Sequence, residues 1–145
     1  MITKVFNPTN KPSLSEKNEI IDFLHEHLDR FRDSKEDIGK AIDFALKEYD
    51  SFGGFVVTGR ENDDIICAVV VNVTGMKGYI PENILVYIAT HADHRGKGVG
   101  KELMKKAIEV ADGNIALHVE HDNPARFLYE KLGFTSKYLE MRLVK

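Results

Sequence analysis

Three alternate glycines lie between an apolar run and a helix-like segment, and their spacing suits the binding of an anion. Gly96, Gly98 and Gly100 follow the apolar residues 84–89 and lead into residues 99–111, whose pattern is helical. Glycine lets the main chain come close to a ligand, and the first N–H groups of a helix point outward at the positive end of its dipole. These residues therefore predict a main-chain cradle for a pyrophosphate group.

The spacing around these glycines excludes two common phosphate-binding loops. A Walker loop needs a glycine five positions before its Gly-Lys pair and a hydroxyl after it. Arg95 and Glu102 occupy these positions around the pair Gly100-Lys101. A dinucleotide-binding fingerprint needs G-x-G-x-x-G, and its last position, counted from Gly96, falls on a lysine. A nucleotide hydrolase with a Walker loop is therefore disfavoured.

The spacing that fits is R-x-x-G-x-G, formed by Arg95, Gly98 and Gly100. It resembles the acetyl-CoA signature of the GNAT family of N-acetyltransferases. Residues 123–134 are similar to a later segment of that family, an asparagine followed by a helix that ends in Tyr-Glu-Lys-x-Gly-Phe. Two motifs in the family's order are far more specific than one glycine loop. Together with the elements between them, they cover about the last two-fifths of the chain.

The resemblance implies acetyl-CoA as the cosubstrate. Main-chain N–H groups from Arg95 through Lys101 would hold the pyrophosphate, and cationic side chains would meet its charge and that of the 3′-phosphate. The end of the preceding strand would pair with the pantetheine arm and supply an oxyanion N–H, and Asn123 would reach the pantetheine or an ordered water. The cofactor-binding residues that this implies are Ile88, Ala89, Thr90, Arg95, Gly96, Lys97, Gly98, Val99, Gly100, Lys101, Asn123 and Arg126.

Acetyl transfer to an amine needs a neutral amine, donors for the developing oxyanion and a proton for the departing thiolate. Tyr129 takes the position where the family often places the general acid; without the resemblance, a tyrosine beside Leu128 and Leu132 is more typical of a core residue. For the general base the family commonly uses an ordered water or a glutamate near the start of the strand before the loop. Glu82 is the nearest carboxylate, and an ordinary turn residue is the alternative.

Two histidine pairs and one cysteine are the residues that could support other chemistry. His91 and His94 are three residues apart, as are His118 and His121, a spacing that zinc sites use. No cysteine flanks either pair, so no metal site is predicted. Cys67 lies in an apolar run and is typical of a buried strand residue rather than a nucleophile.

Composition limits the partners. The chain has 145 residues, a formal net charge of −3, 43% hydrophobic and 30% charged residues, as expected of one domain spanning 1–145 without nucleic-acid or membrane binding. The start lacks a long apolar segment, and the run 65–71 is too short to cross a bilayer, which predicts a cytoplasmic protein.

The charge is unevenly distributed along the chain. Residues 1–72 carry a net charge of −5 and residues 73–145 a net charge of +2. If acidic side chains of the first half line the acceptor groove, they would favour a cationic amine. The simpler explanation of this negative charge is that the carboxylates lie on solvated helix faces.

The predicted order of elements agrees with the family's fold, an α/β arrangement with a mixed, mostly antiparallel sheet and helices on both faces. Capping boxes at Ser13 and Ser34 begin two helices, and Gly53-Gly54 ends the second. Residues 138–144 are predicted to close the sheet with one or two strands. The remaining elements are strands at 2–6, 55–58, 65–74, 84–89 and 115–119 and helices at 99–111 and from 123 to Gly133.

The sequence thus predicts an N-acetyltransferase that moves an acetyl group from acetyl-CoA to a primary amine by direct attack in a ternary complex, since no activated Cys or Ser nucleophile is evident. The alternative is a non-catalytic CoA-binding or regulatory module, in which Tyr129 is structural. The acceptor stays open among polyamines, aminoglycosides, amino acids, protein N-termini and lysine side chains. The family includes many homodimers, but no residue indicates the oligomeric state.

Overall fold

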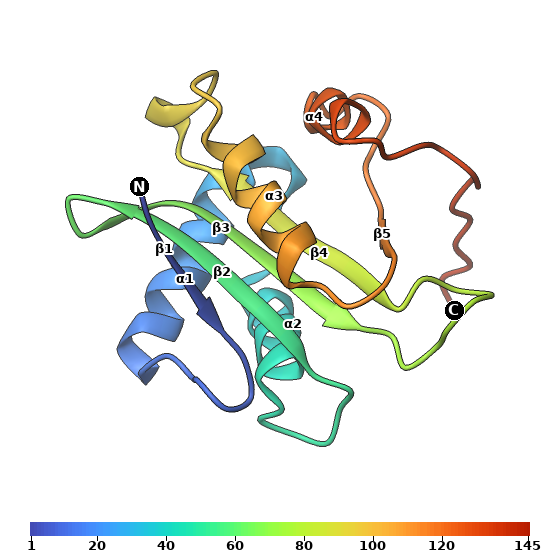
Figure 1. Ribbon diagram of the computed structural model, residues 1–145, viewed down its shortest axis with the longest axis horizontal. Coiled ribbons are helices and arrows are strands. Elements are labelled where there is room, and N and C mark those ends of the chain that lie inside the picture. The colour runs from blue at the N-terminus through green and yellow to red at the C-terminus, as the bar shows by residue number, and fades with distance from the viewer.

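Five strands form the central sheet of the computed structural model, which describes residues 1–145 (Figure 1). The strand order follows the sequence, β1-β2-β3-β4-β5. Neighbours from β1 to β4 are antiparallel, and β4 pairs with β5 in parallel. The fold class predicted from the sequence is confirmed. The strands are β1 (Ile2–Phe6), β2 (Gly54–Glu61), β3 (Asp64–Val73), β4 (Asn83–Thr90) and β5 (Ile115–Leu117).

Four α-helices cover the sheet, with α1 and α2 on one face and α3 on the other (Figure 1). None of them has the length and apolar character needed to span a bilayer. Two short 3₁₀ helices, η1 (Asp29–Phe31) and η2 (Ala92–His94), lie in the links after α1 and β4. The α-helices are α1 (Leu14–His27), α2 (Lys35–Leu46), α3 (Val99–Val110) and α4 (Ala125–Lys131).

The first two helices begin where the sequence predicts, but the second ends earlier. Ser13 and Ser34 each accept a hydrogen bond from the N–H of the third residue that follows, which confirms both predicted caps. The predicted end of α2 at Gly53-Gly54 is wrong, because the helix ends at Leu46. Lys47 adopts a left-handed conformation there, and its N–H bonds back to the last turn of the helix.

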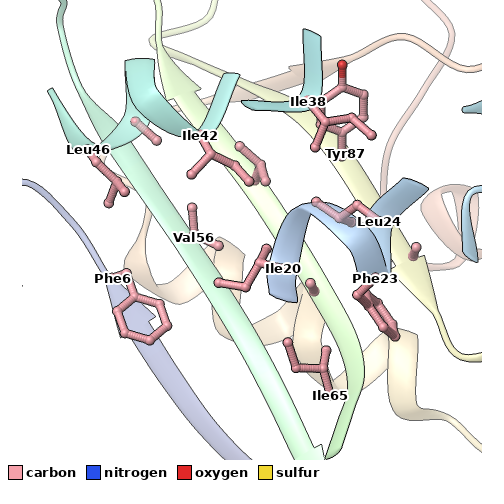
Figure 2. Packing of buried hydrophobic residues seen from close by; sticks show 14 residues of the cluster. Phe6, Ile20, Phe23, Leu24, Ile38, Ile42, Leu46, Val56, Ile65 and Tyr87 are labelled. Atoms are coloured by element: carbon pink, nitrogen blue, oxygen red, sulfur yellow. The ribbon is translucent and has the colours of Figure 1, made fainter. Parts of the chain in front are cut away.

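The sheet separates two apolar cores. Figure 2 shows the core beneath α1 and α2, where Ile20, Leu24 and Ile42 meet Val56 of β2. The second core lies between the sheet and α3 and includes Leu103, Met104 and Ala107. Strand β3 contributes to both cores, so its residues are buried on both faces. This explains why β3 reads as a continuous apolar run rather than as an alternating one.

The predicted strand or strands over residues 138–144 are absent, which corrects that expectation. The chain after α4 forms no helix or strand as far as Lys145. Five large apolar side chains of this segment are between 79% and 89% exposed. A strand needs a neighbour for its main-chain hydrogen bonds, and no strand of this chain lies in register beside the segment. The exposed apolar residues are Tyr138, Leu139, Met141, Leu143 and Val144.

Two glycines give opposite predictions for stability. Gly39 lies inside α2, and a methyl group there would have only Ile21 Cδ1 nearby, at 3.6 Å. Since alanine is favoured over glycine in helices, we expect Gly39→Ala to raise the free energy of unfolding by about 0.5–1 kcal/mol. A methyl group on Gly54 would lie 2.1 Å from the Val71 carbonyl oxygen. Gly54→Ala should therefore lower the free energy of unfolding by about 2 kcal/mol or more. Urea denaturation measures both, and equal effects of the two substitutions would contradict this packing.

Candidate functional site

The glycine loop leaves three N–H groups free at the start of α3. Gly96 and Gly98 have φ values of 77° and 78°, in the left-handed region that favours glycine. Gly98 is the N-cap of α3 and offers no side chain to bond the helix N–H groups. The first main-chain bond of the helix runs from the Glu102 N–H to the Gly98 carbonyl. The N–H groups of residues 99–101 therefore have no acceptor within the chain.

Positive charge adds to this helix end. Lys97 and Lys101 are exposed, and neither forms a salt bridge. Glu102 is the one acidic residue in the first turn of α3. Free N–H donors, the helix dipole and two uncompensated ammonium groups together make a site suited to a phosphate or pyrophosphate group.

Gly100 brings the two sequence motifs together in space. A methyl group on Gly100 would lie 3.1 Å from Thr90 Oγ1, at the end of β4, and 3.4 Å from Leu128 Cδ2, in α4. The start of α3 therefore packs closely against both the preceding strand and the helix of the second motif. Only a residue without a side chain fits between these two neighbours without displacing one of them.

The Arg95 side chain ties the glycine loop to two neighbouring elements. Its Nε donates to the Thr90 carbonyl at 3.2 Å, and Nη2 donates to the His27 carbonyl at 2.9 Å. The second bond places a cation at the C-terminus of α1, where the helix dipole favours it. The side chain thus joins the loop to β4 and to α1, and it leaves the main chain of the loop free for a ligand.

His27 is a part of this arrangement that the sequence analysis missed. Its Nδ1 accepts a hydrogen bond from the Ala92 N–H at 3.3 Å, and its ring lies 4.2 Å from the ring of His91, centre to centre. Burial, and then the neighbouring His91, lower the pKa of His27 below its usual value. The sequence held no sign of this contact, because 65 residues separate the two bonded partners. No three His, Cys, Asp or Glu side chains of the chain converge to hold a metal ion.

Strand β4 has an open edge beside the loop. A β-bulge leaves Val86 without its own partner on β3, and pairing with β5 ends at Leu85. The His91 N–H donates to the Ile66 carbonyl, so the alternation of antiparallel bonds turns the main chain of Ile88 and Thr90 away from β3. The Thr90 carbonyl receives Arg95, and the other polar groups of these two residues face the gap between β4 and β5. Ala89 points into the α1 and α2 core.

Tyr129 is buried beside this gap. Its side chain is 7% exposed and packs with the α3 core, its ring centre 5.9 Å from that of Phe134. The hydroxyl makes no hydrogen bond within the chain, and burial raises the pKa of Tyr129 to about 12. The phenol is therefore protonated at neutral pH and holds a proton that no protein group receives.

Asn123 and Arg126 hold the second motif in shape. Asn123 Oδ1 accepts a hydrogen bond from the Ala125 N–H at 3.0 Å, in the turn before α4, and its side-chain NH₂ group has no acceptor within the chain. Arg126 Nε lies 3.0 Å from Glu130 Oε1, and the pair is partly exposed. Arg126 is therefore partly neutralised, unlike Lys97 and Lys101.

The structure does not bring Glu82 to the other candidate residues. Glu82 precedes β4 at the end remote from the loop, and its Oε1 accepts a hydrogen bond from the Asn114 N–H at 3.2 Å. The eight residue-to-residue steps from Glu82 to Thr90 span roughly 25 Å. The carboxylate instead packs against Gly113 and shapes the turn before β5.

Tyr87 is a second polar contact that the sequence analysis missed. Its hydroxyl donates to Asp33 Oδ2 at 2.5 Å, which links the middle of β4 to the segment between η1 and α2. Burial, and then the hydrogen bond to Asp33, raise the pKa of Tyr87 far above its usual value. This bond holds the α1–α2 link against the face of β4 that lies opposite α3.

Comparison with known proteins identifies the class. The family model described as acetyltransferase (GNAT) matches residues 20–134. The chain therefore belongs to the GNAT acetyltransferase family, which confirms the resemblance drawn from the two motifs. A search of curated proteins found no significant match to this sequence.

Solved structures share the fold at low sequence identity. A transcriptional regulator from Bacillus halodurans has a TM-score of 0.71 and 19% identity, over 99% of this chain and 100% of that one. The aminoglycoside 6′-N-acetyltransferase AAC(6′)-Ig from Acinetobacter haemolyticus has a TM-score of 0.69 and 15% identity, over 100% and 98%. The ribosomal-protein-S18-alanine N-acetyltransferase from Escherichia coli has a TM-score of 0.67 and 17% identity, over 94% and 80%.

The lowered pKa of His27 predicts how the free energy of unfolding depends on pH. Unfolding restores the ordinary pKa, so the unfolded chain binds more protons as the pH falls through about 6.5 towards the lowered value. Folding stability contributed by neutral His27 is therefore present above about pH 6.5 and is lost below it. We expect urea denaturation to show a smaller decrease between pH 7 and pH 5 for His27→Gln than for the wild type.

The matched control is His25→Gln, in the same helix turn, because His25 makes no hydrogen bond to the loop. It should keep the decrease of the wild type. An equal decrease in wild type and His27→Gln would show that the contact between His27 and Ala92 carries no pH dependence.

Proposed function

We propose that this chain is an acetyl-CoA-dependent N-acetyltransferase that acetylates a primary amine. The observation that carries the proposal is the start of α3, where three free N–H groups and two unpaired lysines adjoin the open edge of β4. This combination suits a ligand that has a diphosphate at one end and an amide-containing arm at the other. Acetyl-CoA has both features, whereas a simple phosphate ester would use only the first.

The residues fit such a ligand in order along the site. The N–H groups of residues 99–101 would bind the pyrophosphate, with Lys97 and Lys101 near its charges. The free main-chain groups of Ile88 and Thr90 would pair with the pantetheine amides as a neighbouring strand would. The amide group of Asn123 would add a donor from the other side of the gap. The side chain of Arg95 would act through the loop, which it holds in place.

Acetyl transfer in this site would use Tyr129 as the general acid. The amine nitrogen attacks the thioester carbonyl, the bond from carbon to sulfur breaks, and Tyr129 gives its phenol proton to the leaving thiolate. A main-chain N–H of the β4 edge would donate to the developing oxyanion. We assign the proton lost by the amine to an ordered water, because Glu82 lies at the far end of β4 and is bonded to Asn114.

An amine acceptor is supported by two structural neighbours. The aminoglycoside and ribosomal-protein-alanine acetyltransferases that share this fold are named for amine-bearing acceptors. The charge of the link between α1 and α2 adds no support, because its two aspartates, Asp29 and Asp33, are balanced by Arg30 and Arg32.

The alternative function is a CoA-binding module without catalysis. Its support is the burial of Tyr129, since a tyrosine packed against Phe134 would also serve as a core residue. One of the structures that share the fold is named a transcriptional regulator. Binding alone does not separate this alternative from the enzyme, so a kinetic measurement is needed.

Titration calorimetry tests the ligand. We expect acetyl-CoA to bind with micromolar affinity and ATP and NAD to bind much more weakly. The double substitution Lys97→Ala, Lys101→Ala should weaken acetyl-CoA binding about tenfold or more, since each ammonium group contributes to phosphate binding. Lys105→Ala is the matched control, an exposed and unpaired lysine one turn further along α3. Equal affinity for acetyl-CoA and ATP, or no binding of acetyl-CoA, would overturn the proposal.

Substitution of Tyr129 tests catalysis. Tyr129→Phe removes one hydroxyl that has no partner in the chain, so the fold and the acetyl-CoA affinity should be retained. We expect the rate of thiol release from acetyl-CoA in the presence of an accepted amine to fall about 100-fold, in the range of general-acid contributions. The amines to be screened are a polyamine, an aminoglycoside, a peptide with a free N-terminus and a lysine peptide. An unchanged rate would remove Tyr129 from the mechanism, and no release with any amine would favour the binding module.

A further inference from the structure

An open pocket lies at the end of α3 that is remote from the glycine loop. Its volume is about 520 Å³, within the range of small-molecule sites. The pocket is bounded by the turn after α3, the link between β3 and β4, and the link between α2 and β2. Helix α3 has 12 residues and is roughly 18 Å long, so this pocket is separate from the site at its first turn. The lining residues that matter here are Phe52, Phe55, Glu82, Asn83, Val110 and Asp112.

A buried amide in the wall of the pocket lacks one hydrogen-bond partner. Asn83 begins β4 and is 2% exposed, and its Nδ2 donates to the Asp112 carbonyl at 2.7 Å and to the Asn114 carbonyl at 3.2 Å. Its Oδ1 accepts no hydrogen bond from the chain. The one buried side-chain oxygen that is fully enclosed without a partner is Thr58 Oγ1, so Asn83 Oδ1 stays open to the pocket. A nearly buried acceptor of this kind calls for a ligand that donates a hydrogen bond.

Negative charge surrounds this acceptor. Glu82 and Asp112 line the pocket, and neither carboxylate forms a salt bridge. Glu82 Oε1 accepts from the Asn114 N–H, and its Oε2 has no partner in the chain. Helix α3 ends here without a basic residue in its last turn, so the negative end of its dipole is uncompensated. Lys77 is the one cation of the lining, and it is exposed and unpaired. The pocket therefore favours a ligand that is positively charged.

Apolar side chains form the rest of the wall. Phe55 is buried in the α3 core, whereas Phe52 is 66% exposed. The Phe52 ring nevertheless has a fixed neighbour, because a methyl group on Gly75 would lie 2.4 Å from its Cε2 atom. Val110 adds an aliphatic surface from the end of α3. Such a wall suits a ligand with an apolar body, and aromatic rings add attraction for a cation.

We propose that this pocket binds an organic cation in which a primary ammonium group is attached to an aromatic or branched apolar body. The ammonium group donates to Asn83 Oδ1 and lies near the carboxylates of Glu82 and Asp112, while the body packs against Phe52 and Val110. A metal ion would leave the apolar wall uncovered, and an anion would meet like charge. Acetyl transfer is not required for this binding, so the failure of either proposal leaves the other standing.

Binding of 2-phenylethylammonium to the full chain without acetyl-CoA tests the site. We expect NMR titration to give a Kd of about 1 mM or lower, with the largest amide shifts at Asn83, Val110 and Gly113. 2-Phenylethanol keeps the ring and a donor without the charge, and it should bind at least tenfold more weakly. Methylammonium keeps the charge without the ring and should also bind at least tenfold more weakly. 3-Phenylpropanoate, which reverses the charge, should not bind.

Removal of the carboxylate charges locates the ammonium group. Glu82→Gln keeps an oxygen for the Asn114 N–H, and Asp112→Asn keeps the shape of the side chain, so both substitutions should preserve the fold. The double variant should bind 2-phenylethylammonium about tenfold more weakly and 2-phenylethanol as the wild type does. The matched control is the double variant Glu102→Gln, Glu109→Gln. It removes two carboxylates of α3 that lie outside the pocket and should leave both affinities unchanged.

Three results would each overturn the proposal. The first is equal affinity for 2-phenylethylammonium and 2-phenylethanol, since the charge would then have no role. The second is an affinity that the double substitution of Glu82 and Asp112 does not change. The third is a set of amide shifts confined to Ile88 and Thr90, which would place the probe in the gap between β4 and β5.

Discussion

The site depends on the early divergence of β4 and β5. The two strands pair only from Asn83 to Leu85 of β4, and the rest of β4 is bonded on the β3 side alone. A fully paired parallel strand would consume the main-chain groups of Ile88 and Thr90. The side chains around the gap keep it from closing, because Tyr129, Leu117 and Val119 pack into one apolar cluster with α3. The open edge is therefore a consequence of core packing, and the unsatisfied polar groups along it are accessible to a ligand.

The main chain and the side chains of the glycine loop have different roles. The resemblance implies a main-chain contact of Arg95 with the ligand, and the Arg95 guanidinium is bonded to two carbonyl oxygens inside the fold. Those bonds fix the loop between β4 and α1, and His27 adds a third contact to the Ala92 N–H. A loop that these contacts already hold in place loses little conformational freedom when a ligand binds to its N–H groups. Ligand charge is left to the lysines, whose long side chains can adjust to the phosphates.

Local signals in the sequence predicted most of the elements, and nonlocal contacts account for the differences. The helix caps at Ser13 and Ser34 and the left-handed glycines depend on a few neighbouring residues, so their patterns could be read directly. The joining of both motifs at Gly100 was not predicted, because it depends on contacts between α3, β4 and α4. The contacts of His27 and Tyr87 connect residues 65 and 54 positions apart, and no spacing rule predicts them. Glu82 was chosen for its nearness to a strand in the sequence, but the strand itself carries it away from the loop.

The segment after α4 shows a further limit of local patterns. One or two closing strands were predicted over 138–144, yet this segment forms none and its large apolar side chains are exposed. A strand needs a neighbouring strand for its main-chain hydrogen bonds, and the residues of one segment do not say which strand supplies them.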